Sequence, residues 1–272
     1  SATFSFSGDP NTTFECSVNG GAYATCTSPY TASGLATGSR TFAVRAIDLA
    51  GNQSSATTVS WTIDTTAPTG TATLTQKPDA TTTSQSATFA FTLGADGVSA
   101  QCSLDGAAYA ACTSPVTQSG LAEGSHTFAV RTLDAAGNVS TGTPTSYTWT
   151  IDLGPPSGTP TFSSQPSSPS SSLRGTFAFT GATAPETYEC LVDAGTWTAC
   201  TSPYTTPALA DGAHTFSVRI VDPAGNIGAN LGSATWTVDT AAPSAPSITG
   251  GSTGTVASTT GSVTFTAPPS GT

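Results

Sequence analysis

The sequence has no methionine, two histidines and few basic residues. Lys and Arg together number 6 against 16 Asp and Glu, which gives a formal net charge of −10 over 272 residues. Nucleic acids and anionic membranes bind basic surfaces, so this balance excludes both as expected partners. Because methionine is missing even at position 1, we expect a mature or excised piece of a longer chain.

Long apolar runs are also missing. No stretch is long enough to predict a membrane-spanning helix, and no signal peptide is visible, so we expect no direct insertion into a membrane. Charged residues make up only 8% of the chain, so Ser, Thr, Asn and Gln must keep its surface soluble. Such a composition is typical of extracellular β-proteins.

The sequence does contain one motif three times. The matching phenylalanines are Phe42, Phe128 and Phe216, at steps of 86 and 88 residues, and the copies read SRTFAVRAIDLAGNQS, SHTFAVRTLDAAGNVS and AHTFSVRIVDPAGNI. A period of this size corresponds to a small domain, so the sequence predicts a tandem array. We place the first repeat at 1–66, the second at 67–153, the third at 154–241 and the start of a fourth at 242–272.

Within each repeat, short segments alternate apolar and polar residues, the period of a half-buried strand. Asn19-Gly20 and Asp105-Gly106 are strong hairpin signals between two such segments. About seven short strands, turn signals every 8–12 residues and no helical periodicity predict an all-β fold, a tandem array of Ig-like antiparallel β-sandwiches. Pro68, Pro156 and Pro243 mark the short joints between repeats.

The six cysteines fall in three pairs with the same spacing. They are Cys16 and Cys26, Cys102 and Cys112, and Cys190 and Cys200. Zinc sites use Cys-x-x-Cys spacing or nearby histidines, and these pairs have neither. We therefore predict three local disulfides, formed in an oxidising compartment, without links between repeats.

The order F-x-C-S-x-D/N-G, then H-T-F-x-V-R-x-x-D-x-A-G-N, then Y-T-W-T-I-D-T-T-A-P resembles the bacterial immunoglobulin-like repeats of large secreted and cell-surface proteins. The resemblance covers essentially the whole chain in three phases. It implies a non-catalytic structural role, as a stalk of an adhesin or a surface fibre. It also implies an extracellular or cell-surface location.

Two patterns that suggest catalysis receive a simpler interpretation. His126 and His214 lie a whole repeat apart with no nucleophile nearby, so we interpret both as solvated strand residues. Gly250-Gly-Ser252-Thr-Gly254 matches a nucleophile-elbow pattern, but it follows every histidine and lies in a low-complexity loop. We therefore predict no enzyme activity.

The carboxylates at the joints leave two interpretations open. In an Ig-like sandwich, the exit of one repeat abuts the turn before the last strand of the next, so we expect Asp64 near Asp134 and Asn138. By the same reasoning, we expect Asp152 near Asp222 and Asn226. An aspartate that begins a D-x-A-G-N turn accepts hydrogen bonds from its own backbone, as in an Asx-turn. Alternatively, each cluster holds one Ca²⁺, which needs several oxygen ligands; proteins of the resembled class often stiffen joints this way.

The function follows from the array. We predict a structural segment that forms an elongated stalk or fibre and pairs head to tail with neighbouring repeats or other copies. Residues 242–272 match the joint and edge strand that the first repeat lacks, since Phe4 and Phe265 lie 261 residues apart, three periods of 87. The alternatives are a glycan- or receptor-binding module, for which Tyr23, Tyr109 and Trp197 are the best candidates, and the spacer of a secreted enzyme.

Overall fold

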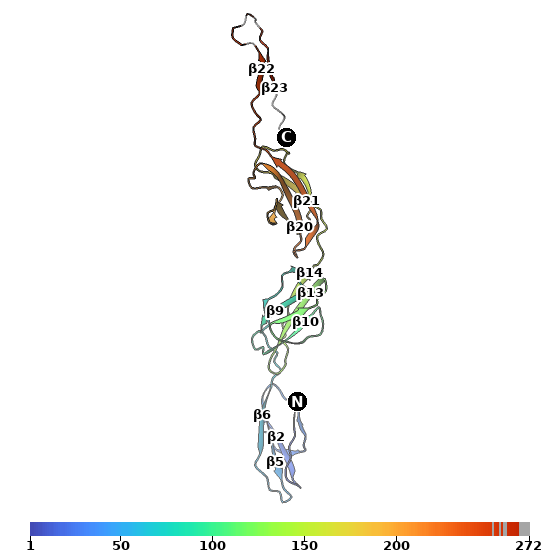
Figure 1. Cartoon of the computed structure of the whole chain (residues 1–272). Helices are drawn as coiled ribbons and strands as arrows, with labels where there is room; N and C mark the ends of the chain where they lie inside the picture. Colours follow the sequence, from blue (N-terminus) through green and yellow to red (C-terminus); the bar gives the residue numbers. More distant parts are fainter. Residues whose placement is uncertain (252, 256, 258–259, 267–272) are drawn as a thin grey trace. The chain divides into compact units, whose positions relative to one another are not determined.

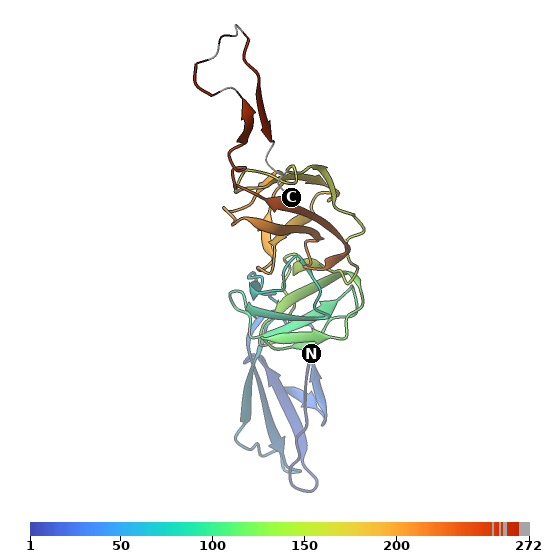
Figure 2. The ribbon, with the colours of Figure 1, turned by 45° about the horizontal axis from the view of Figure 1, so that its top comes forward.

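The computed structural model describes residues 1–251, 253–255, 257 and 260–266. In these residues the chain consists of strands and connecting loops without a helix (Figures 1 and 2). It groups into two compact units, Ser1–Ile151 and Asp152–Thr272. The first unit contains the first two repeats. The prediction of an all-β fold is confirmed.

Each repeat has a large sheet in which four antiparallel strands follow the same order. In the first repeat the order is β3 (Ala24–Cys26), β2 (Thr13–Val18), β5 (Gly38–Ile47) and β6 (Thr57–Ile63). In the second it is β11 (Ala110–Cys112), β10 (Ser99–Leu104), β13 (Gly124–Leu133) and β14 (Thr145–Ile151). In the third it is β18 (Thr198–Cys200), β17 (Thr187–Val192), β20 (Gly212–Val221) and β21 (Ile227–Val238). The repeated motif therefore forms the long central strand of each sheet (Figure 1).

A smaller sheet packs against each large one. It comprises β1 (Ala2–Phe4) and β4 (Tyr30–Ala32); then β12 (Val116–Ser119), β9 (Ser86–Thr92) and β7 (Thr73–Gln76); then β15 (Thr161–Ser164), β16 (Thr176–Thr180) and β19 (Tyr204–Thr205). Phe89 of β9 stacks on Phe128 of β13 with ring centroids 4.1 Å apart. The matching distance between Phe177 and Phe216 is 4.2 Å. These stacked rings join the two sheets into a sandwich with one aromatic core.

The disulfides close the hairpins at the edge of each large sheet. The structure links Cys16 to Cys26, Cys102 to Cys112 and Cys190 to Cys200, each with Cα atoms 5.8 Å apart. At the hairpin tips, Asn19 and Gly20 have φ of 54° and 69°, and Asp105 and Gly106 have φ of 52° and 76°. Left-handed φ at both central residues matches the right-handed twist of the flanking strands, and Asn, Asp and Gly adopt it most readily.

Residues 70–82 of the second repeat pair with both of its sheets. β7 pairs with β9, and the short β8 (Thr81–Thr82) pairs in parallel with β14. Thr132 Oγ1 donates to the Gly70 carbonyl at 2.8 Å, and Tyr147 Oη donates to the Pro78 carbonyl at 3.1 Å. In the first repeat the small sheet has only two strands, β1 and β4, within the described residues.

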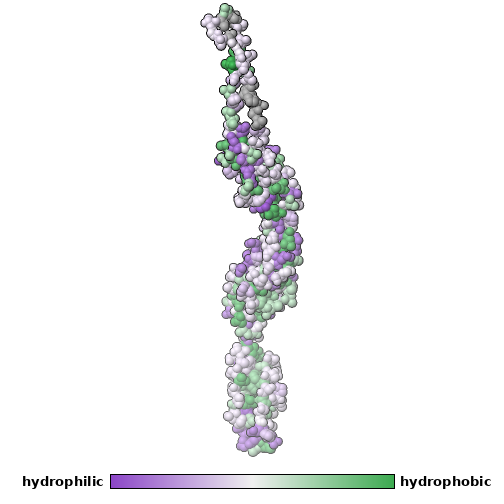
Figure 3. All heavy atoms as spheres, in the orientation of Figure 1, coloured by the Kyte–Doolittle hydropathy of each residue, from purple (hydrophilic) through white to green (hydrophobic). Residues whose placement is uncertain are grey.

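The C-terminal part forms a two-stranded hairpin of β22 (Ser247–Gly251) and β23 (Val263–Thr266). Its register skips a residue between Ile248 and Gly250, as that of β7 does between Leu74 and Gln76. Ile248 and Phe265 face each other across the hairpin and are 75% and 66% exposed. Elsewhere the visible surface is largely pale in Figure 3, the colour of intermediate hydropathy, which agrees with the low share of charged residues.

Candidate functional site

The D-x-A-G-N turn is an Asx-turn in which a hydrogen bond between the Asn and Asp side chains adds to the backbone bonds. In the second repeat, Asp134 Oδ1 accepts hydrogen bonds from the backbone N–H groups of Ala136 and Asn138 at 2.8 and 2.9 Å. The Asn138 side-chain amide donates to Asp134 Oδ2 at 2.9 Å. Gly137 has a φ of 88°, which a residue with a side chain rarely adopts. Both carboxylate oxygens of Asp134 are thus occupied by N–H donors.

The same bonds recur around Asp48 in the first repeat and Asp222 in the third. The side-chain amide of Asn138, followed by the backbone N–H of the same residue, holds the pKa of Asp134 below its ordinary value. The Asn52 amide does the same to the pKa of Asp48. A carboxylate that accepts several N–H bonds is stabilised in its charged form, so the turn is built for ionised aspartate.

Two of the three turns also hold the segment that precedes their repeat. The Asn138 side-chain amide donates to the Asp64 carbonyl at 3.1 Å, and the Asn226 amide donates to the Asp152 carbonyl at 2.8 Å. We call each of these bonds a joint latch. In the first repeat the Asn52 amide donates only within its turn, among the hydrogen bonds of the described residues. Asp134 and Asp222 are each 9% exposed, whereas Asp48 is exposed.

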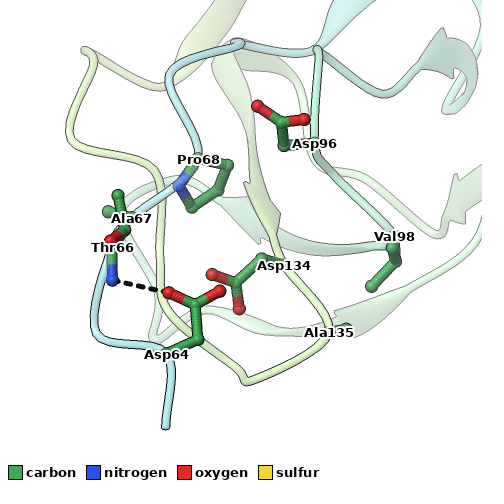
Figure 4. Close-up of a pocket in the computed structure, with 8 residues that line it drawn as sticks. All are labelled: Asp64, Thr66, Ala67, Pro68, Asp96, Val98, Asp134 and Ala135. Carbon is green, nitrogen blue, oxygen red and sulfur yellow. Dashed lines mark hydrogen bonds between the residues drawn. The ribbon is translucent and has the colours of Figure 1, made fainter. Parts of the chain in front are cut away.

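The aspartates that end the closing strands cap the joints themselves. Asp64 Oδ1 accepts from the Thr66 N–H at 2.9 Å, and Asp152 Oδ1 accepts from the Gly154 N–H at 3.1 Å. Asp64 and Asp134 both line a cavity of about 320 Å³ with Asp96, Pro68 and Val98 (Figure 4). The structure therefore brings Asp64, Asp134 and Asn138 together, and likewise Asp152, Asp222 and Asn226.

These residues, as arranged, do not fit a Ca²⁺ site. Calcium requires six to eight oxygen ligands, but Asn138 directs its nitrogen at the joint carbonyl and Asp134 has both oxygens bound to N–H groups. In the described part of the chain, no group of three or more His, Cys, Asp or Glu side chains is arranged to hold a metal ion. The Asx-turn interpretation accounts for the hydrogen bonds of both Asp134 oxygens, and Ca²⁺ binding stays a prediction to be measured.

The histidines correct an expectation. We expected His126 and His214 to be solvated, but their side chains are only 11% and 12% exposed. Each ring bonds the aspartate at its hairpin tip and packs on the tryptophan of the closing strand, with ring centroids 5.5 Å apart. The signal in the sequence was the shared spacing of 21 residues between Asp105 and His126 and between Asp193 and His214.

The candidate ligand-binding aromatics are partly covered. A guanidinium carbon lies 4.1 Å from the ring centre of Tyr23, 4.1 Å from that of Tyr109 and 4.4 Å from that of Trp197. The arginines concerned are Arg45, Arg131 and Arg219 on the central strands. A cation over one face of each ring gives these aromatics a structural contact that recurs in every repeat.

Ser252, the centre of the Gly250–Gly254 pattern, lies outside the described residues. Among the residues that the structure covers, none forms a helix with the length and apolar character needed to cross a bilayer.

No family model and no curated protein matches the chain. Solved structures do resemble it at low identity. Fibronectin(III)-like modules of Clostridium thermocellum CbhA are 16% identical and align over 61% of this chain and 93% of their own, with a TM-score of 0.40. A 1.5-MDa bacterial ice-binding adhesin is 19% identical over 87% of this chain and 90% of the adhesin structure, with a TM-score of 0.33.

A third match is a tetra-tandem repeat in the extending region of a large adhesion protein. It is 18% identical over 89% of this chain and 71% of that structure, with a TM-score of 0.28. The fold assignment rests on the strand pairing of the chain itself.

Proposed function

We propose that this chain is a non-catalytic structural repeat segment of a bacterial extracellular or cell-surface protein, and that its repeats form an elongated stalk or fibre. Three disulfides suit an oxidising compartment outside the cytosol. The arginines over Tyr23, Tyr109 and Trp197 favour this structural role over a glycan- or receptor-binding module.

The observation that carries the proposal is the joint latch. A protein whose repeats were independent beads would gain nothing from a specific bond between a turn and the segment that enters the repeat. Here Asn138 and Asn226 make that bond at equivalent positions, to the backbone carbonyl of the aspartate that ends the preceding closing strand. The prolines that follow, such as Pro68, restrict the joint further because their φ is fixed.

Head-to-tail pairing is the second part of the proposal. The edge of β1 that faces away from β4 has no partner strand in the described residues, while β9 and β16 each have one on both sides. The hairpin of β22 and β23 has the bulge of β7 but leaves Ile248 exposed. We propose that each end pairs with a further repeat, from a covalent neighbour or from another copy.

Small-angle X-ray scattering of the 272-residue chain tests the stalk. Three sandwiches held in line have a maximum dimension on the order of 100 Å, since a central strand of 10 residues at about 3.3 Å per residue gives about 33 Å for each repeat. The variant with Asn138→Ala and Asn226→Ala should show a broader, shorter distance distribution. Asn52→Ala is the matched control, because its amide bonds only within its own turn.

The scattering test distinguishes the stalk from the joint latch. A compact wild-type profile contradicts the stalk itself. A long wild-type profile that the double variant leaves unchanged contradicts the latch as the source of stiffness.

A further inference from the structure

We infer that His126 with Asp105, and His214 with Asp193, form a pH-sensitive clasp that fastens the disulfide hairpin to the central strand in the second and third repeats. The first repeat has a version of the same clasp that does not titrate near neutral pH. The clasp would make two of the three repeats tighten in acidic surroundings while the first stays unchanged.

The geometry of the ring requires a charged imidazole. His126 Nδ1 lies 2.8 Å from Asp105 Oδ2, and its Nε2 lies 2.9 Å from the Ala122 carbonyl oxygen. Carboxylate and carbonyl oxygens only accept hydrogen bonds, so both ring nitrogens must carry a proton. A neutral ring loses one donor, and its lone pair then faces an oxygen. His214 has the same two partners, Asp193 Oδ2 and the Ala210 carbonyl, both at 2.8 Å.

Each clasp also closes through the backbone of the hairpin tip. Asp105 Oδ1 accepts from the Thr127 N–H at 2.7 Å, and the Asp105 N–H donates to the Thr127 carbonyl at 2.8 Å. One aspartate thus bonds two consecutive residues of the central strand. The third repeat repeats both bonds between Asp193 and Thr215, at 2.7 and 2.8 Å.

Few charged groups surround the rings. The hairpin tip supplies Asp105 or Asp193, the closing strand supplies the uncharged Trp149 or Trp236, and the preceding loop supplies a carbonyl. That loop also carries an acidic residue, Glu123 in the second repeat and Asp211 in the third. Asp211 bonds Thr240 through both oxygens, and within the described part of the chain neither acidic residue has a hydrogen bond to the ring. The aspartate at the tip is therefore the charge that pairs with the imidazolium.

The shifts in pKa agree with this geometry. The hydrogen bond to the Ala122 carbonyl, followed by that to Asp105, raises the pKa of His126. His214 has the matching causes, Ala210 and then Asp193, and its pKa is also raised. Partial burial favours the neutral form of Asp105, but its bonds with His126 and Thr127 outweigh burial and lower its pKa.

The sign of the pH effect follows from these directions. A histidine whose pKa is raised on folding contributes stability that is fully present below the pKa of the free side chain. That stability is lost as the pH rises through the raised value in the folded protein. Ionised Asp105 and Asp193 contribute above the pKa of a free aspartate, so the clasp is strongest between the two ranges, in mildly acidic solution.

The first repeat provides an internal control. Arg40 replaces the histidine and donates to the Ala36 carbonyl through Nε at 3.1 Å and Nη2 at 2.6 Å. Asn19 replaces the aspartate, and its Oδ1 accepts from the Thr41 N–H at 3.2 Å. A guanidinium stays charged at all relevant pH values and an amide does not ionise, so this hairpin keeps its bonds from pH 5 to 8.

Backbone amide exchange of the whole chain, followed by NMR, tests the inference. The equivalent amides are those of Asn19 and Thr41, Asp105 and Thr127, and Asp193 and Thr215. Between pH 5 and pH 8, after correction for the intrinsic rate, protection should fall by about threefold or more in the second and third pairs, the size expected when each clasp loses one hydrogen bond. Protection in the first pair should stay constant. Equal pH dependence in all three pairs overturns the inference.

His126→Arg sharpens the result, because it installs the residue that the first repeat uses. It should abolish the pH dependence at Asp105 and Thr127 and leave that at Asp193 and Thr215 intact. The unmodified chain gives a second readout that needs no variant to fold: its two histidines give two imidazole titrations. Midpoints above the ordinary histidine value of about 6.5 support the clasp, and midpoints at or below it overturn the inference.

Discussion

The first and second repeats carry the same core motif, yet only the second has a sealed core. Phe89, Val130, Trp149 and Ile151 are at most 1% exposed. Their counterparts in the first repeat are Phe4, Val44, Trp61 and Ile63, and all four are only partly buried. The ring stack is nearly the same, with centroids 4.3 Å apart between Phe4 and Phe42. The central sandwich thus forms in both repeats, and a further segment decides how well it is closed.

That segment is the stretch of residues 70–82. It adds β7 beside β9 and β8 beside β14, and it brings Ala72, which is 3% exposed, and Leu74 into the core. The backbone N–H of Thr150 also donates to the Ala80 carbonyl at 2.9 Å. The stretch between the joint and the F-x-F strand is therefore part of the folded second repeat, because it pairs with both sheets and packs into the core.

The largest effect should come from removing the stacked ring in the two repeats. Phe89→Ala should lower the free energy of unfolding of the second repeat by about 3–5 kcal/mol, because it leaves a cavity in a sealed core. Phe4→Ala should cost the first repeat about 1–2 kcal/mol, since less area is removed from water there. Amide exchange resolved by repeat measures both losses. Equal losses would show that the first core is as closed as the second.

A smaller change in free energy is expected when a strand of another copy pairs with the open edge of β1 in the first repeat. If another copy covers it, sedimentation of the 272-residue chain should show association that grows with concentration. Ile248→Asp should abolish the association, because β22 then carries a charge where β7 carries Leu74. Leu231→Asp changes a residue on β21 that is 54% exposed, and it serves as the control. A monodisperse monomer in which NMR finds both residues 1–10 and residues 242–272 fully ordered argues against head-to-tail pairing.

Much of this architecture was predictable because the same motif occurs three times, so the copies can be compared with one another. The alternation around Phe128 and the left-handed tip residues Asp105 and Gly106 predict a strand and a hairpin from local chemistry alone. Three copies of the same motif show which residues recur at each position of the repeat. The recurring strand pattern predicts the sandwich, and the recurring turn and closing strand predict that Asp64 lies near the turn of the next repeat.

The clasp and the latch were harder to foresee, because each depends on the direction of a hydrogen bond. We interpret His126 and His214 as solvated from the sequence because no nucleophile lies nearby, but a histidine without a catalytic partner can still be held by hydrogen bonds, as both are by the aspartates of their hairpin tips. The sequence places Asn138 beside Asp64, but it does not say whether the amide presents oxygen or nitrogen. That orientation separates a metal ligand from a hydrogen-bond donor.

The smallest effect, on both binding heat and chain stiffness, is therefore expected from adding calcium. The Ca²⁺ interpretation predicts binding heat in calorimetry and a stiffer chain in scattering, whereas the latch geometry predicts neither, since N–H groups already occupy both oxygens of Asp134. We expect no heat on titration and superimposable scattering profiles with Ca²⁺ and with chelator. If heat appears, Asp64→Asn and Asp134→Asn should remove part of it when the site is at the joint. Asp48→Asn should remove none, because its turn holds no joint among the described residues. Heat with that pattern would establish the calcium site and would require Asn138 to rotate its amide.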